Sequence, residues 1–251
     1  MIKRLVFLLM LLFPLSVYGF SDMAADCTKC HTISKEEANQ LLKEIIPNAT
    51  ILEIKDSPFK GFWEVDIETG GKKGLLYVDF SKKFLFAGSI VDIKAKRNLS
   101  QERFTELNKI DVASIPLDDA LILGNKEAKH RIIVFDDPDC PFCAKLHQEM
   151  KKVVEERKDI AFYLKMYPLK IHPKAYEKAK TIVCEKSIAL LEDSFAKKEI
   201  PKPNCETKVI DENIKLAERL GISGTPAMIF PDGRLVPGAM DAKKIIEMIG
   251  K

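Results

Sequence analysis

The feature that most constrains the fold is a pair of cysteines placed between an apolar run and a helical pattern. Residues 132–135 are continuously apolar, as in a strand that is buried on both faces. Cys140 and Cys143 follow closely, and residues 141–157 have the periodicity of a helix. From residue 131 onward, strand and helix patterns alternate in the order β-α-β-α-α-β-β-α. This order predicts an α/β domain with a C-x-x-C motif at its first strand-to-helix junction.

The C-x-x-C motif has the composition and the position of a reactive thiol pair. Cys140 falls near the expected N-cap of the helix and Pro141 at its first position, where a missing N–H costs nothing. The free N–H groups and the helix dipole favour a thiolate there, and the thiolate is the nucleophilic form of cysteine. Cys143, one turn into the helix, lies within reach to resolve a mixed disulfide. The motif therefore predicts redox chemistry.

Three nearby aspartates and two other kinds of site limit this interpretation. Asp136, Asp137 and Asp139 oppose a thiolate wherever they point at it, so we expect only that the pKa of Cys140 is lowered. The alternatives to redox chemistry are a structural disulfide and half of a zinc site. A zinc site needs two more ligands, and the two later cysteines do not have C-x-x-C spacing.

The first twenty residues have the pattern of a secretory signal peptide. Lys3 and Arg4 precede an apolar run, residues 5–15, and residues 17–19 offer a cleavage site near Gly19. The alternative is an uncleaved anchor helix, but the run is short for a membrane span and contains Pro14. We therefore expect residues 1–19 to be removed and the mature protein to be exported.

Composition indicates a globular protein of one or two domains. The chain has 251 residues, of which 46% are hydrophobic and 31% charged. The formal net charge is +3, and loss of Lys3 and Arg4 leaves 38 basic and 37 acidic residues. This balance, without a basic stripe, argues against nucleic-acid binding.

The first half of the mature chain reads as a helix on an antiparallel sheet. Residues 34–46 have one apolar face, and Ser34 with Glu37 forms a potential capping box. Short alternating strand patterns follow over residues 49–93. Ser100 is placed to cap a further helix, which could connect two domains.

Three segments of the chain resemble the DsbC/DsbG family of periplasmic disulfide isomerases. They are residues 135–147 around the C-x-x-C motif, residues 220–227 with Gly-Thr-Pro, and residues 235–238. The resemblance covers most of the chain from about residue 34 and is weakest before residue 95. It implies an α+β protein: a cystatin-like dimerisation domain, a linker helix and a thioredoxin-like catalytic domain with a helical insertion. We place these at residues 20–95, 96–113 and 114–251, after a signal peptide at 1–19.

The resemblance also implies roles for particular residues. Cys140 and Cys143 match the catalytic pair. Pro226 matches a cis proline that faces this pair, and Thr225-Pro226 would bind an extended substrate chain; an ordinary trans loop proline is the alternative.

Cys184 and Cys205 match a second, non-catalytic disulfide of the DsbC branch. Such a bridge closes a loop of about 20 residues, which in the chain-entropy model contributes roughly 3 kcal/mol. This disulfide is therefore expected to be structural.

One motif departs from the better-known members of this family. Cys27, Cys30 and His31 form C-x-x-C-H, the attachment pattern of a c-type haem, with His31 as axial ligand. The family does not require haem, and a short Cys27–Cys30 disulfide or a metal site would explain the same residues. No other cofactor is expected.

The function expected from these observations is thiol:disulfide interchange. A V-shaped homodimer with an apolar cleft would isomerise or reduce incorrect disulfides in secreted proteins in the periplasm, and a membrane-bound thiol reductase would keep the pair reduced. A reductant of oxidised single cysteines is an alternative that Pro141 slightly favours. An electron-transfer haem protein and a chaperone-like binding module are alternatives from other classes.

Overall fold

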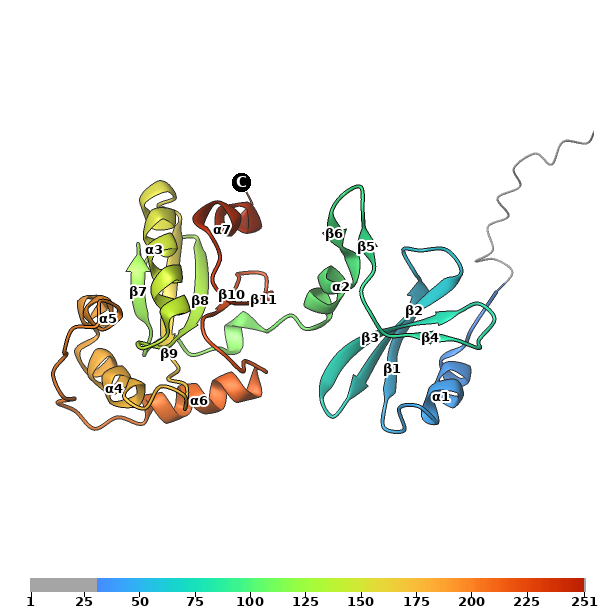
Figure 1. The fold of residues 1–251 in the computed structure, drawn as a ribbon, viewed down its shortest axis with the longest axis horizontal. Helices are drawn as coiled ribbons and strands as arrows, with labels where there is room; N and C mark the ends of the chain where they lie inside the picture. The colour runs from blue at the N-terminus through green and yellow to red at the C-terminus, as the bar shows by residue number, and fades with distance from the viewer. Residues whose placement is uncertain (1–30, 251) are drawn as a thin grey trace, which may run out of the picture. The chain divides into compact units, whose positions relative to one another are not determined.

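A computed structural model describes residues 31–250 of the chain. The expected signal peptide, residues 1–19, and the motif cysteines Cys27 and Cys30 lie outside the described residues. The chain divides into two compact units, one that ends at Ala87 and one that begins at Gly88 (Figure 1). The described helices include none that is both long enough and apolar enough to cross a membrane.

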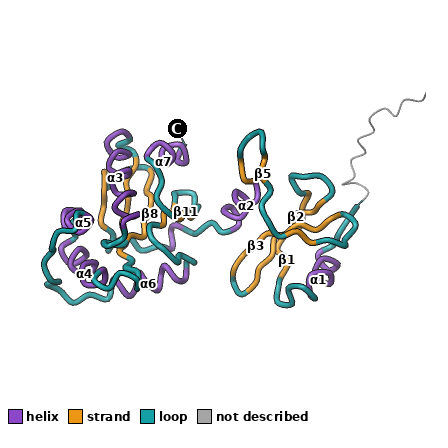
Figure 2. The backbone as a smooth tube through the Cα atoms, viewed as in Figure 1, coloured by secondary structure: helices purple, strands orange, loops and turns teal. Residues whose placement is uncertain are grey.

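The first unit is a helix packed on a four-stranded antiparallel sheet, as expected (Figure 2). Its strands are in the order β1-β2-β3-β4. The elements are α1 (Lys35–Lys43), β1 (Thr50–Asp56), β2 (Phe62–Thr69), β3 (Lys72–Asp79) and β4 (Leu85–Phe86). Ala38 and Leu42 of α1 are buried against Trp63, Val65 and Leu76 of the sheet.

The start of α1 follows the expected capping pattern only in part. The Ser34 side chain accepts a hydrogen bond from the Glu37 N–H at 3.1 Å, which caps the helix. The Glu37 carboxylate instead accepts from Lys82 Nζ at 2.7 Å and so ties the helix to the end of β3. The Glu37 carboxylate, which a capping box would pair with the Ser34 N–H, therefore joins the helix to the sheet instead.

A small hairpin and a short helix begin the second unit. They are β5 (Val91–Asp92), β6 (Arg97–Asn98) and α2 (Leu99–Leu107), followed by a 3-10 turn at Val112–Ser114. The expectation that Ser100 caps α2 is wrong. Asn98 caps the helix by accepting from the Gln101 N–H at 2.9 Å, and the Ser100 hydroxyl accepts from the Ile90 N–H.

A five-stranded mixed sheet forms the centre of the second unit. Its order is β11-β10-β8-β9-β7, and only β8 and β9 are parallel. The strands are β7 (Leu121–Gly124), β8 (His130–Asp136), β9 (Ile160–Met166), β10 (Ala227–Ile229) and β11 (Leu235–Pro237). The edge strand β7 is absent from the order of elements that the sequence predicts. The continuous apolar run of β8 agrees with its place in the middle of the sheet.

Helices cover both faces of this sheet. They are α3 (Pro141–Glu156), α4 (Ala175–Glu185), α5 (Ile188–Phe195), α6 (Val209–Arg219) and α7 (Ala242–Ile249). One core joins Ile132 and Val134 of β8 to α3, α4, α5 and α7. The other joins Ile133 and Phe135 to α6 and to the segment before β7.

The helical pattern over residues 173–191 is two helices rather than one. Lys186 adopts the left-handed conformation, with φ of 46°, and ends α4. Ser187 then caps α5 by accepting from the Leu190 N–H at 3.2 Å. The inserted helix α5 can therefore turn back toward the start of α3, where its residue Ser194 makes a contact described below.

A fully buried lysine lies in the middle of β9. The Lys165 side chain is 0% exposed, and its ammonium donates to Pro116 O at 2.8 Å and to the Asp119 carboxylate. Asp119 also accepts from Asn213 Nδ2 of α6 at 2.9 Å. Because a buried charge is costly unless it is paired, this network fixes the segment before β7 against β9 and α6.

A disulfide joins Cys184 of α4 to Cys205, the pairing that the family resemblance implies. The two residues are 21 positions apart, and their Cα atoms are separated by 5.9 Å. The bridge closes the segment that contains all of α5.

Replacement of Cys184 and Cys205 together by alanine should lower the free energy of unfolding by about 3 kcal/mol, because the unfolded chain regains the entropy of the open loop. Denaturant unfolding of both proteins, with and without a reducing agent, measures this loss. A reductant should weaken the parent protein and leave the variant unchanged, and equal stability of the two oxidised proteins would contradict the prediction.

Candidate active site

Cys140 and Cys143 lie where strand β8 passes into helix α3. Cys140 is the N-cap residue of α3, and Pro141 occupies its first turn, as the sequence predicts. Both cysteines are free thiols in this structure. Cys140 is 4% exposed and Cys143 is fully buried, so only the first thiol can meet a substrate.

The surroundings of Cys140 favour its thiolate. A hydrogen bond from the Cys143 thiol is the largest cause that lowers the pKa of Cys140, to about 5, and the backbone N–H groups of Phe142 and Cys143 add to it. Burial opposes this shift. The lowered pKa that the helix position predicts is therefore confirmed, and at neutral pH Cys140 is ionised.

Cys143 has the opposite environment. Burial raises its pKa far above the ordinary range of a thiol, and its hydrogen bond to Cys140 and the nearby Asp136 act in the same direction. The Asp137 N–H donates to Cys143 Sγ at 3.5 Å. Cys143 is consequently a neutral thiol at rest and needs a proton acceptor before it can attack.

Asp136 is placed to be that acceptor. Burial raises its pKa to about 7, whereas a hydrogen bond from the Cys143 thiol lowers it and the neighbouring charge of Asp137 raises it. Side chains alternate along β8, so Asp136 points to the same face as Val134, the face that α3 covers. The sequence places Asp136 on the same face of the strand as Val134, two residues away, and this spacing is the local signal for its role.

The other two aspartates are engaged away from Cys140. The Asp137 carboxylate is fully buried and accepts from the N–H groups of Asp139 and Leu169, at 2.8 and 2.7 Å. Nδ1 of His172 lies 2.8 Å from the same carboxylate. Asp139 pairs with Lys178 at 2.5 Å. These partners explain why Asp137 and Asp139, although close in sequence, leave the thiolate form of Cys140 favoured.

The Thr225-Pro226 peptide bond is cis and lies against the active cysteine. Cys140 Sγ and the Thr225 carbonyl oxygen are 3.5 Å apart. A hollow of about 370 Å³ follows this loop and is lined by residues 221–227, Leu235, Pro237 and Gly238. Residues 221–227 and 235–238, which lie far along the chain from Cys140, therefore meet beside its thiol.

Comparison with known proteins agrees with this geometry. A thioredoxin-like domain model matches residues 117–251, and the model of the disulfide bond isomerase N-terminal domain matches residues 29–101. The chain belongs to the DsbC family of thiol:disulfide interchange proteins. It is thus an enzyme with the thioredoxin fold that exchanges thiols and disulfides.

Two curated relatives and one solved structure illustrate the similarity. The chain is 26% identical over 197 residues to the probable thiol:disulfide interchange protein DsbC of Bordetella avium, covering 78% of this chain and 68% of that protein. It is 28% identical over 199 residues to DsbC of Dickeya dadantii, covering 78% and 79%. A disulfide interchange protein from Neisseria gonorrhoeae is 32% identical, with a TM-score of 0.47 over 54% of this chain and 96% of that one.

The inserted helix α5 supports the catalytic turn of this DsbC-family chain. The buried Ser194 hydroxyl donates to Pro138 O at 2.9 Å, two residues before Cys140. His147 is fully buried, with Nε2 3.1 Å from Glu192 Oε1, and its ring packs 5.5 Å from that of Phe195. His147 is therefore a packing and hydrogen-bonding residue, and the role of Ser194 was not visible in the sequence.

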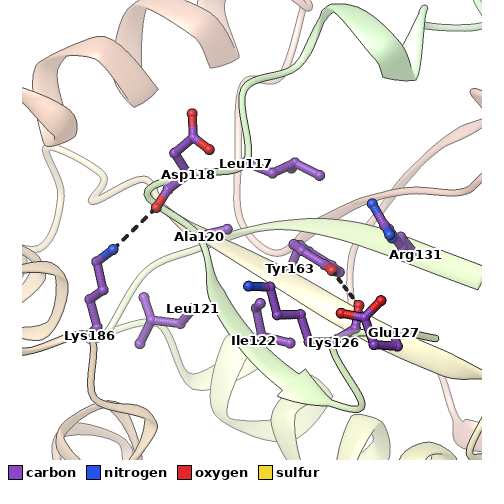
Figure 3. A pocket seen from close by; sticks show the side chains of 10 residues that line it. All are labelled: Leu117, Asp118, Ala120, Leu121, Ile122, Lys126, Glu127, Arg131, Tyr163 and Lys186. Carbon is purple, nitrogen blue, oxygen red and sulfur yellow. Dashed lines mark hydrogen bonds between the residues drawn. The ribbon is translucent and has the colours of Figure 1, made fainter.

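A larger hollow, of about 600 Å³, lies near the start of β8 rather than at the thiols (Figure 3). Two of its polar groups are engaged within the protein. The Tyr163 hydroxyl donates to Lys126 O at 3.1 Å, and Lys186 Nζ donates to Asp118 O at 3.5 Å. Arg131, near the start of β8, lies over the Tyr163 ring. This hollow is therefore at the opposite end of the strand from Cys140.

The C-x-x-C-H motif receives no support as a haem site. Cys27 and Cys30 lie outside the described residues, and the described His31 ring stacks on Phe80 with centroids 5.1 Å apart. Among residues 31–250, no cluster of three or more histidine, cysteine or acidic side chains could hold a metal ion.

Replacement of Asp136 by asparagine should slow the resolving attack of Cys143 about tenfold or more at pH 8, because the neutral amide cannot accept the thiol proton. In the parent protein this step should slow as the pH falls through about 7, where Asp136 becomes protonated. The lifetime of a mixed disulfide with a small peptide, measured from pH 5.5 to 8.5, reports the step.

A matched control is Asp139→Asn, which removes the same charge from a residue that pairs with Lys178 instead of facing Cys143. The unfolding free energy gives a second readout. The folded-state pKa of Asp136 is raised above its unfolded value, so the free energy of unfolding should decrease as the pH rises from about 4 to about 7. This decrease should be absent in Asp136→Asn. An unchanged pH profile of resolution would contradict the role of Asp136.

Proposed function

We propose that this protein isomerises or reduces incorrect disulfides in exported proteins, with Cys140 as the attacking and Cys143 as the resolving residue. One observation carries the proposal. A thiol with a pKa of about 5, which is 4% exposed, lies beside the Thr225 carbonyl, and a neutral, fully buried thiol lies behind it. Such a pair gives a fixed order of attack.

The proposed reaction begins when the Cys140 thiolate attacks one sulfur of a client disulfide. A Cys140–client disulfide forms, and the other client sulfur leaves as a thiolate. If a client thiolate then attacks the client sulfur of this bond, Cys140 leaves unchanged and the client disulfides are rearranged. If Cys143 attacks Cys140 Sγ after giving its proton to Asp136, the client is reduced by two electrons and the protein becomes the disulfide.

Thr225 and Pro226 are the proposed substrate-binding residues. The Thr225 carbonyl faces Cys140, and the hollow of about 370 Å³ beside it can hold an extended peptide segment. After net reduction the Cys140–Cys143 disulfide needs an electron donor, for which we propose a membrane-bound thiol reductase. Repeated isomerisation needs no external electrons, but it does need the pair kept reduced.

We further propose a periplasmic homodimer, with residues 1–19 as the signal peptide. Residues 20–95 would form the dimerisation domain, residues 96–113 the linker and residues 114–251 the catalytic domain. Support comes from the match to the disulfide bond isomerase N-terminal domain and from the edge strand β4, where Phe86 is 41% exposed and Phe84, just before the strand, is 69% exposed. Pairing of two such edges would cover apolar surface.

The roles of the two thiols are tested by single substitutions. Cys140→Ser should abolish exchange with a model disulfide, since it removes the attacking thiolate. Cys143→Ser should accumulate mixed disulfides with client proteins, because the resolving thiol is gone. Non-reducing electrophoresis and mass spectrometry detect these adducts, and adducts on Cys140→Ser but not on Cys143→Ser would reverse the assignment.

The dimer is tested by comparing the mature chain, residues 20–251, with the fragment 114–251. The mature chain should sediment as a dimer and the fragment as a monomer. The fragment retains Cys140, Cys143 and Pro226, so it should reduce small disulfides and lose most isomerisation of a client with several disulfides. A monomeric mature chain, or a fragment with undiminished isomerase activity, would overturn this part of the proposal.

A further inference from the structure

A third hollow, of about 800 Å³, lies beside the catalytic turn, between the start of α4 and the loop after α5. Its lining is rich in lysine and contains two glutamates. The charged residues that line it are Lys174, Lys178, Lys197, Lys198, Lys202, Glu177 and Glu199. Neither the exchange chemistry nor the substrate contact at Thr225 uses this hollow.

Two of its lysines touch the residue that precedes Cys140. Lys178 Nζ lies 2.5 Å from Asp139 Oδ1, and Lys197 Nζ lies 3.4 Å from Asp139 O. Since an extended chain advances about 3.3–3.6 Å per residue, a peptide held at Cys140 reaches the hollow within a few residues.

The wall of the hollow is held in place by contacts within the fold. The buried Thr181 hydroxyl of α4 donates to Pro201 O at 2.9 Å, which joins the loop after α5 to the helix. Pro201 and Pro203 further restrict this loop. The lysines are thus presented on a defined surface.

Part of the positive charge is available to a ligand. Lys178 is paired with Asp139, and Lys198 with Asp193. Lys174 and Lys202 are exposed and form no ion pair with any residue in the described range 31–250. With Asp139 and Asp193 counted beside the two lining glutamates, five ammonium groups face four carboxylates. The excess is one positive charge, and Lys174 and Lys202 can attract negative charge at close range.

We propose that this hollow binds acidic side chains of a client polypeptide that lie within a few residues of the attacked cystine. The inference rests on the proposed function, because it concerns the same substrates. The client backbone contacts Thr225 whatever its sequence, whereas the hollow would favour clients with acidic side chains. We therefore expect disulfides that are flanked by acidic residues to be attacked first.

The test uses two disulfide peptides that differ only in having two glutamates or two glutamines, two to four residues from one cystine sulfur. We expect the acidic peptide to react with the full-length reduced protein about three- to tenfold faster at low salt. This ratio should approach one at 0.5 M salt, where charges are screened beyond a few ångströms. A ratio of one at low salt would overturn the proposal.

The lysines are tested by Lys174→Gln combined with Lys202→Gln, which should bring the ratio for the two peptides close to one. The matched control is Lys243→Gln with Lys244→Gln on α7, which packs on the later part of α3 through Ala242 and Gly250. This control should keep the ratio of the parent protein. Equal ratios in the two double variants would contradict the assignment of the hollow.

A binding measurement separates this proposal from the proposed function. A cysteine-free peptide carrying the same glutamates should bind Cys140→Ser, by fluorescence anisotropy at low salt, more tightly than its glutamine counterpart. Binding without exchange in the parent protein would defeat the proposed function and leave the hollow as a site for acidic peptides. Exchange with no preference in either rate or binding would leave the function and defeat the inference.

Discussion

The catalytic turn depends on one buried carboxylate, that of Asp137. It accepts hydrogen bonds from the N–H groups of Asp139 and Leu169 and contacts His172 Nδ1. These three polar partners stabilise the carboxylate although the side chain is fully buried. These bonds join the turn after β8 to the loop after β9. With Ser194 holding Pro138 from α5, they set the direction in which the chain enters α3 and therefore where the Cys140 thiol points.

The same helix start gives the two thiols opposite properties. Cys140 collects N–H groups and a thiol hydrogen bond that favour its anion, whereas Cys143, one turn further, is buried and neutral. This difference fixes which sulfur reacts first. Asp136, with a pKa of about 7, then links the second step to the protonation of a carboxylate that is 1% exposed. The sequence of the two attacks therefore follows from how deeply each thiol is buried.

The sequence predicted the local parts of this site better than the tertiary ones. The apolar run of β8, the start of α3 and the position of Cys140 at its N-cap depend on neighbouring residues, and all three are confirmed. The sequence did not predict the cap of α2 or the break between α4 and α5. Residues next to Asn98 and Lys186 are equally suited by type to cap or end a helix. Two of the partners of Asp137, Leu169 and His172, lie more than thirty positions away, and no local pattern contains them.

The buried Lys165 gives the protein an internal reporter of its own opening. Amine-reactive reagents modify exposed lysines within the folded state, but the ammonium of Lys165 is enclosed by Pro116 and Asp119 and is 0% exposed. Its acylation therefore requires that the segment before β7 detach from β9. The amount of one acylated peptide in a mass spectrum would then report how often this part of the second unit opens, with no fluorophore attached to the protein.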